Sequence, residues 1–123
     1  MRVGGGVWEG VYSFPSRFEG ADGGSPEEFV AAAHAGCYSM AFSNTLASAG
    51  HVPTSVRTTA TVHFGPDPAG GFHISRIDLV VEADVPGIDT AAFLDHAEEA
   101  KVGCPISKLY KGAEITLAAT LLS

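Results

Sequence analysis

The chain has 123 residues, of which 46% are hydrophobic, and its 7 Lys and Arg against 14 Asp and Glu give a formal net charge of −7. This length predicts one domain, and the apolar content is enough for a core. The acidic balance excludes the basic surface that nucleic acids and anionic membranes attract. No apolar run is long enough for a signal peptide or a transmembrane helix, and two cysteines are too few for a secreted disulfide framework. We expect a soluble, cytoplasmic protein that binds neither nucleic acid nor membrane.

The first half of the chain predicts one strand and one long helix. Residues 7–14 mix β-branched and aromatic side chains, which is typical of a strand, and a flexible turn follows at 20–25. A helix is expected from Ser25 to Gly50, with Ser25 as its N-cap, Pro26 at its first position and Gly50 as its C-cap.

The second half predicts an α+β fold of mostly antiparallel strands with helices on one face. The expected elements are strands at 55–64, 72–85 and 113–122, a hairpin loop at 65–71, and helices at 90–103 and 105–112. The apolar pattern of the second of these strands changes phase near Ser75–Arg76, which predicts a β-bulge there.

The helix at 25–50 has almost no polar face. Val30, Cys37 and Met40 lie on one side, while Phe29 and Gly36 are among the apolar or small residues on the others. A helix that is apolar on nearly every side must be buried on nearly every side, and one sheet covers a single face. A second copy of the chain is the simplest cover, so the sequence predicts an obligate homodimer.

Cys37 and Cys104 allow two interpretations. Each can be a small buried hydrophobe, as cysteines commonly are. Alternatively they form a redox pair, in which case the reacting thiol must be a thiolate. Cys37 lies in mid-helix and would need a nearby cation. Cys104 precedes Pro105 at a helix N-cap position, where unpaired N–H groups would favour its thiolate.

His34 stands three residues before Cys37, on the same side of the helix within one turn. It is either a hydrogen-bonded histidine in or near the core or the base of a Cys–His nucleophile pair. A metal site that combines His34, Cys37 and Cys104 with another histidine is the weaker alternative, since none of the usual paired-ligand spacings occurs.

Arg17 and Glu27 have ordinary structural interpretations. Arg17 reads as an exposed loop charge, and Glu27 reads as a first-turn acid that the helix dipole favours. Residue chemistry alone does not single out either of them.

Four stretches of the chain nevertheless resemble the OsmC and organic hydroperoxide resistance family, more closely its OsmC branch. They are SRFEG (16–20), GSPEEFVAAAHAGCYSMAFSNTLASAG (24–50), VPTSVRTTATV (52–62) and AKVGCPISKLYKGAEITL (100–117), in the family's order. Members of this family usually have a further strand before the segment that matches residues 3–14. The resemblance therefore implies a single OsmC-like domain over residues 1–123 that is short at its N-terminus.

The resemblance also implies an activity. Family members are thiol-dependent peroxidases that favour organic hydroperoxides and form intertwined homodimers with active sites at the subunit interface. Matched onto this chain, Cys37 is the peroxidatic cysteine, Cys104 the resolving cysteine, Arg17 the group that stabilises the thiolate and Glu27 the group that orients Arg17. No cofactor is expected, and a lipoyl or thioredoxin-type dithiol would reduce the Cys37–Cys104 disulfide. The alternatives are a non-catalytic, stress-related dimer and a hydrolase or transferase that uses His34.

The helix itself sets a geometric condition on these roles. Glu27 and Cys37 are 10 residues apart, which is roughly 15 Å along a straight helix. If Glu27 orients Arg17 beside Cys37, it is therefore expected to come from the partner chain of a two-fold dimer.

Overall fold

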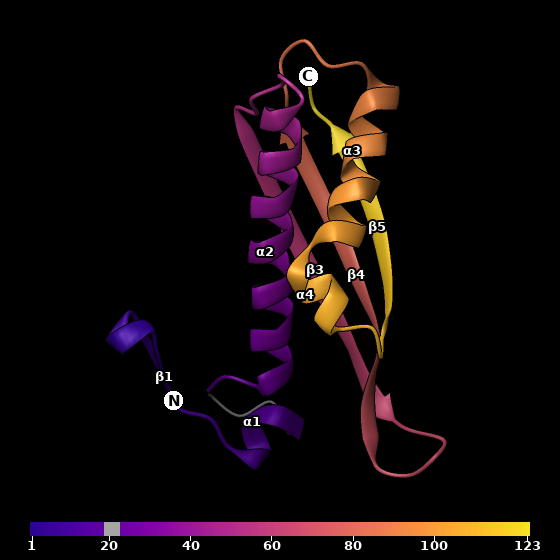
Figure 1. The fold of residues 1–123 in the computed structure, drawn as a ribbon. Helices are drawn as coiled ribbons and strands as arrows, with labels where there is room; N and C mark the ends of the chain where they lie inside the picture. Colours follow the sequence, from indigo (N-terminus) through magenta and orange to yellow (C-terminus); the bar gives the residue numbers. More distant parts are fainter. Residues whose placement is uncertain (19–22) are drawn as a thin grey trace.

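The computed structural model describes residues 1–18 and 23–123. Its body is a three-stranded sheet with helices on one face, as the α+β prediction requires (Figure 1). The sheet has the order β3-β4-β5 and consists of β3 (Ser55–Pro66), β4 (Phe72–Asp84) and β5 (Glu114–Leu121). Its helical layer consists of α2 (Pro26–Ser48), α3 (Thr90–Gly103) and the short α4 (Pro105–Leu109). In the described residues, no helix is both long and apolar enough to cross a membrane.

Strands β3 and β4 form an antiparallel hairpin with a bulge at the predicted place. His63 pairs with Arg76, but the next residue, Phe64, pairs with Ile74, so Ser75 is the extra residue. The bulge moves the apolar positions of β4 to the opposite side of the strand, which accounts for the change of phase in the sequence.

The pairing of β4 with β5 is parallel, so the prediction of antiparallel strands is wrong for this pair. The reason is the connection. Helix α3 lies between the two strands in sequence and carries the chain back to the end of the sheet where β4 began, and such a crossover joins parallel strands.

Both ends of helix α2 lie close to the positions that its capping residues predict. At its start, the Ser25 hydroxyl accepts a hydrogen bond from the Glu28 N–H at 3.2 Å. At its end, the N–H of Gly50 donates to Ala47 O and that of His51 to Leu46 O, which is a Schellman motif. Gly50 has a φ of +89°, and it lies one position beyond the C-cap.

The core lies between one face of α2 and the sheet. The fully buried residues of α2 recur every four positions, as His34, Tyr38, Phe42 and Leu46. Of these, Tyr38, Phe42 and Leu46 pack with the inward-facing side chains of β4 (Ile77, Leu79, Val81 and Ala83) and of α3 (Phe93, Ala97 and Ala100). The Tyr38 hydroxyl donates to Ala97 O at 2.9 Å, which joins α2 to α3 inside the core.

The side of α2 opposite its buried face is open in the single chain. Met40 is 76% exposed, and Gly36 and Ala33 are also exposed. The sequence predicted a dimer because a single chain could not cover this apolar helix. The structure agrees that the single chain leaves part of the helix uncovered.

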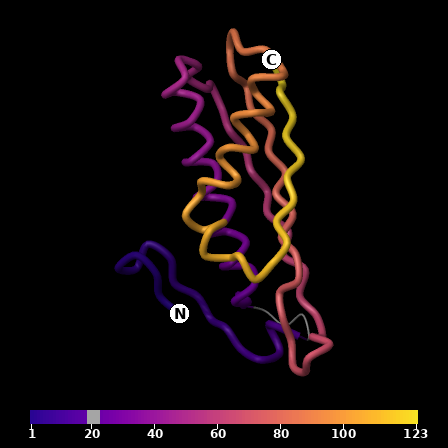
Figure 2. Tube along the Cα trace, turned by 45° about the vertical axis from the view of Figure 1, so that its right-hand side comes forward, coloured from indigo at the N-terminus to yellow at the C-terminus, as the bar shows by residue number. Residues whose placement is uncertain are grey.

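The N-terminal segment differs from the prediction of a strand over 7–14. Its elements are β1 (Arg2–Val3), a 3-10 helix (Gly4–Gly6), β2 (Trp8–Glu9) and helix α1 (Phe14–Phe18). The strand stops early because it pairs only with the two residues of β1, and because Ser13 and Ser16 accept hydrogen bonds from each other's N–H groups, which starts the helix. Figures 1 and 2 both show β1 apart from the body of the fold. Of the predicted turn at 20–25, residues 20–22 lie outside the described residues.

The Schellman motif gives a test of the fold. Replacing Gly50 by Ala should lower the free energy of unfolding by about 1 kcal/mol, because an L side chain is strained at positive φ. Chemical denaturation measures this. Gly103→Ala is the matched control, since Gly103 ends a helix at negative φ with no atom within 4 Å of the added Cβ. Equal losses in both variants would contradict the argument.

Candidate active site

The structure brings the two cysteines of the chain together. Cys37 lies in the middle of α2, Cys104 lies at the junction of α3 and α4, and their sulfur atoms are 3.1 Å apart. Both thiols are free. The sulfur atoms are about 1 Å further apart than in a disulfide, so a small change in side-chain rotation would bring them to bonding distance.

Local structure places Cys104 at this point. It is the C-cap of α3, where its N–H donates to Ala100 O at 2.9 Å, and also the N-cap of α4, because Pro105 begins that helix. The predicted N-cap position is therefore confirmed. The thiol, however, makes no hydrogen bond to the N–H groups of α4. Cys104 is fully buried, with its sulfur beside Cys37.

Within one chain, the surroundings of Cys37 disfavour its thiolate. Burial, first, and the neighbouring Cys104 thiol, second, raise the pKa of Cys37, while a backbone hydrogen bond with Ile106 lowers it. Cys37 is half-buried and borders an open, mainly apolar depression of about 670 Å³, lined by small and apolar side chains of α2 and α4 that include Gly36, Met40 and Ile106. Such a depression suits an apolar ligand, but none of the described residues that line it carries a cation to stabilise a thiolate.

Arg17 and Glu27 form a second pair. Arg17 lies in the last turn of α1 and donates from Nε and Nη2 to Glu27 Oε1, at 2.8 Å for Nε. The Arg17 guanidinium also lies over the Phe64 ring, 4.8 Å from its centroid. The Glu27 side chain is only 13% exposed and that of Arg17 is 38% exposed. The acid is thus nearly enclosed and holds the arginine in one orientation at the start of α2.

The four residues therefore form two pairs and not one cluster. Glu27 and Cys37 belong to the same unbroken helix α2, and their 10-residue separation corresponds to roughly 15 Å. No ion pair or hydrogen bond of the described residues joins Arg17 to Cys37. In a single chain, the guanidinium is at one end of α2 and the thiol is near its middle.

His34 is fully buried, and its partner is a residue that the sequence did not single out. Its Nε2 lies 2.8 Å from Ser107 Oγ, and its Nδ1 has no hydrogen-bond partner in the described structure. Burial lowers the pKa of His34, so the ring is neutral near pH 7. The signal in the sequence was the spacing, because His34 precedes Cys37 by three residues and Ser107 follows Cys104 by three.

Nothing in the described residues suggests a resident metal. No three His, Cys, Asp or Glu side chains in residues 1–18 and 23–123 come close enough to hold an ion.

The sequence and the fold of the chain have known relatives. Residues 19–118 match the family model described as OsmC-like protein. The chain belongs to the OsmC family. Over 106 residues it is 51% identical to Peroxiredoxin OsmC of Escherichia coli (strain K12), a match that covers 86% of this chain and 73% of that protein.

Solved structures of the OsmC family have the same fold. An organic hydroperoxide resistance protein from Elizabethkingia anophelis superimposes with a TM-score of 0.78 at 27% identity, over 94% of this chain and 83% of that one. The organic hydroperoxide resistance protein OhrB of Bacillus subtilis gives a TM-score of 0.79 at 24% identity, over 94% and 84%. At 24% identity, the similarity to OhrB shows a shared fold and nothing more.

The short distance between the sulfur atoms predicts an intrachain disulfide. Treatment with the thiol oxidant diamide should join Cys37 to Cys104, because each thiol is the other's nearest partner at 3.1 Å. Peptide mapping under non-reducing conditions identifies the bond, and Cys104→Ser should abolish it. A predominance of interchain disulfides in the unaltered protein would contradict the pairing.

Proposed function

We propose that this OsmC-family chain is a thiol-dependent peroxidase that reduces organic hydroperoxides to alcohols. The observation that carries the proposal is the Cys37–Cys104 pair, with 3.1 Å between sulfur atoms, beside an open apolar depression. Two of its relatives, one named as a peroxiredoxin and one as an organic hydroperoxide resistance protein, support the same chemistry.

The reaction has two chemical steps. The Cys37 thiolate attacks the terminal oxygen of the hydroperoxide. An S–O bond forms, the O–O bond breaks, and the released alkoxide takes up a proton to become the alcohol. Cys37 is then a sulfenic acid. The Cys104 sulfur attacks the Cys37 sulfur, hydroxide leaves and is protonated to water, and a disulfide remains, so the two thiols have supplied the two electrons.

An external dithiol returns the enzyme to its reduced state. A lipoyl or thioredoxin-type reductant would open the disulfide by thiol exchange, and no bound cofactor is needed for any step. The proposed location is the cytoplasm, where such reductants are kept reduced.

Activation of Cys37 requires a cation that its own chain holds elsewhere. Burial and the Cys104 thiol raise the pKa of Cys37, so the thiolate is scarce near neutral pH in the single chain. A guanidinium near 4 Å would favour the thiolate by about 4 kcal/mol at an effective dielectric constant of 20. We assign this role to Arg17, held in orientation by Glu27.

A homodimer would place Arg17 beside Cys37. Two copies of α2 that run antiparallel across a two-fold axis would bring the Arg17–Glu27 pair of each chain toward Cys37 of the other. The open side of α2 suits this arrangement, because small residues such as Ala33 and Gly36 allow close approach. The N-terminal segment, which exposes apolar side chains such as Val7 (90% exposed), would also gain cover from a partner.

Two other functions are weaker. A hydrolase or transferase would need His34 as the base for Cys37, but the hydrogen bond of its Nε2 goes to Ser107. The substitution His34→Gln distinguishes the two functions. Only the hydrolase or transferase mechanism predicts that this variant loses turnover completely. A non-catalytic, stress-related dimer would not consume peroxide with a dithiol reductant, so the assay below also tests that alternative.

Replacing each cysteine should stop the reaction at a different step. Cys37→Ser should abolish reduction of cumene hydroperoxide with a dithiol reductant, because it removes the attacking sulfur. Cys104→Ser should allow the first oxidation of Cys37 and then stop or slow turnover, as the sulfenic acid passes to sulfinic or sulfonic acid. Steady-state assays and intact-mass analysis measure these outcomes. Dithiol-dependent turnover by Cys37→Ser, or a Cys37 that stays reduced in Cys104→Ser, would refute the mechanism.

A mixed dimer tests whether the arginine pair acts across the interface. One chain carries Glu27→Ala and keeps Cys37, and the other carries Cys37→Ser and keeps Glu27. If Glu27 and Arg17 serve the partner, the remaining Cys37 faces an intact pair, and about half of the activity of the unaltered dimer should return.

The Glu27→Ala homodimer, at equal concentration of Cys37, is the control for this experiment. A mixed dimer with no more activity per Cys37 than this homodimer would show that Glu27 acts within its own chain or not at all.

A further inference from the structure

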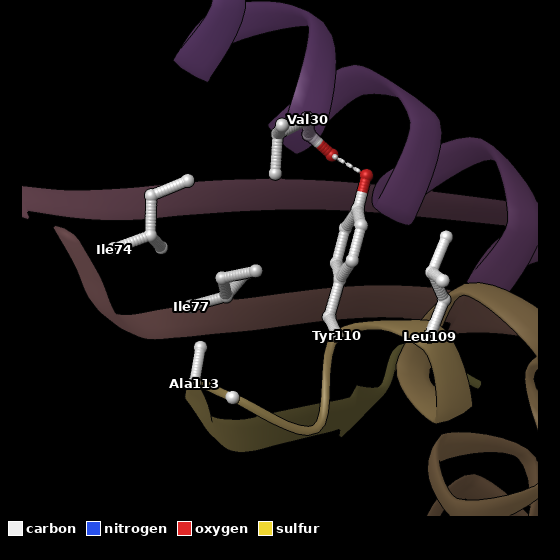
Figure 3. A pocket seen from close by; sticks show the side chains of 7 residues that line it. Val30, Ile74, Ile77, Leu109, Tyr110 and Ala113 are labelled. Atoms are coloured by element: carbon white, nitrogen blue, oxygen red, sulfur yellow. Dashed lines mark hydrogen bonds between the residues drawn. The ribbon is translucent and has the colours of Figure 1, made fainter.

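Helices α2 and α4 meet along a seam of three paired residues. Because the two segments run in opposite directions, positions 30, 34 and 37 of α2 face positions 110, 107 and 104. The pairs are Val30 O with the Tyr110 hydroxyl at 3.4 Å, His34 Nε2 with Ser107 Oγ at 2.8 Å, and Cys37 Sγ with Cys104 Sγ at 3.1 Å. Figure 3 shows the first pair, with Tyr110 reaching from the segment after α4 to the backbone of α2.

The middle pair is the one buried connection in this seam. His34 is fully buried and Ser107 is 7% exposed, whereas the pairs on either side are only partly buried. The rings of His34 and Tyr110 also meet at right angles, with centroids 5.4 Å apart. Helix α4 has five residues, too few to be stable by itself, so its position depends on such contacts.

The site also retains a polar group that packing alone does not require. His34 Nδ1 is buried without a hydrogen-bond partner among the described residues. A buried unpaired nitrogen costs stability, and an apolar residue of similar size would avoid that cost. A role for the Nε2–Ser107 hydrogen bond would explain why a histidine stands here.

We propose that His34 and Ser107 are positioning residues that hold Cys104 against Cys37 and so set the rate at which the disulfide closes. The hydrogen bond fixes α4 one turn beyond Cys104, and Cys104 is the N-cap of that helix. This inference rests on the proposed peroxidase function for its consequence, but the geometry itself concerns only the thiol pair.

The consequence lies in a competition between two reactions of the Cys37 sulfenic acid. Attack by Cys104 releases water and gives the disulfide, whereas attack on a second hydroperoxide gives the sulfinic acid and another alcohol. The first reaction is intramolecular, so its rate depends on how closely Cys104 is held in an attacking position. A looser α4 should shift the outcome toward sulfinic acid.

The test compares three single substitutions of serine. Ser107→Ala removes the hydrogen bond, and Ser107→Thr keeps a hydroxyl at the same place. Ser39→Ala is the control, because it removes another hydrogen bond of α2, the 2.7 Å contact of Ser39 with Thr58 on β3, away from α4.

The first measurement follows one turnover without reductant, by rapid mixing with cumene hydroperoxide, alkylation and intact-mass analysis. In Ser107→Ala the first oxidation of Cys37 should keep its rate, and disulfide closure should slow about tenfold, which corresponds to about 1.4 kcal/mol of activation free energy. The fraction of sulfinic acid should rise accordingly. Ser107→Thr should restore closure, and Ser39→Ala should close at the unaltered rate.

The second measurement needs no peroxidase activity. In glutathione redox buffers, the equilibrium constant for the Cys37–Cys104 disulfide should fall about tenfold in Ser107→Ala, which is about 30 mV for this two-electron couple, with no change in Ser39→Ala. His34→Gln, whose amide can replace Nε2, should lie close to the unaltered protein.

The outcomes separate the two proposals. Unchanged closure and unchanged equilibrium in Ser107→Ala would overturn the positioning role, as would an equal slowing of both oxidation steps. A wild-type protein that consumes no hydroperoxide would instead refute the proposed function, and the glutathione equilibrium would still decide whether Ser107 positions Cys104.

Discussion

Helix α2 runs for 23 residues without a break, so position along it translates directly into distance at 1.5 Å per residue. Its buried face recurs every four residues and is fixed against β4 and α3 by packing and by the Tyr38 hydroxyl. The helix therefore cannot bend to bring its first turn to its middle. That rigidity separates Glu27 from Cys37 within one chain, and it presents Cys37 to α4 in a fixed direction.

Much of this fold could be predicted from local chemistry. The caps of α2, the extent of α3 and the bulge in β4 each depend on residues close together in sequence, such as Ser25, Gly50 and Asp89, which caps α3 through the Ala92 N–H. The parallel pairing of β5 depends on the position at which the chain returns to the sheet after the crossover helix. No single segment of the sequence determines that position. The early end of the first strand had a similar cause, because its residues suit a strand but only β1 pairs with them.

The candidate site, too, could be predicted from the sequence only in part. Cys37 and Cys104 were identified from the sequence, and the structure places them together. The ion pair between Arg17 and Glu27 was expected only from family resemblance, since each residue alone reads as an ordinary surface charge. Ser107 was missed because its significance depends on a contact with a residue 73 positions away. Long-range pairs of this kind become visible only when the fold is known.

In the proposed dimer, the reactivity of Cys37 would depend on assembly. The single chain keeps Cys37 in surroundings that raise its pKa, and it keeps the Arg17 guanidinium at the start of the helix, beside Glu27. If the cation comes from a second chain, the thiol gains its nucleophilicity only when two chains have met. An unpaired chain would then hold a poorly reactive thiol.

In the single chain, the two sulfur-bearing residues differ in exposure, which bears on how the proposed disulfide would be reduced. Cys104 is fully buried beneath α4, whereas Cys37 is half-buried and borders open space. A dithiol that approaches a Cys37–Cys104 disulfide from solvent therefore meets the Cys37 sulfur first. Attack there would leave the reductant attached to Cys37 and expel Cys104 as the leaving thiol. In such a disulfide, the Cys37 sulfur would be the more accessible of the two to thiol exchange.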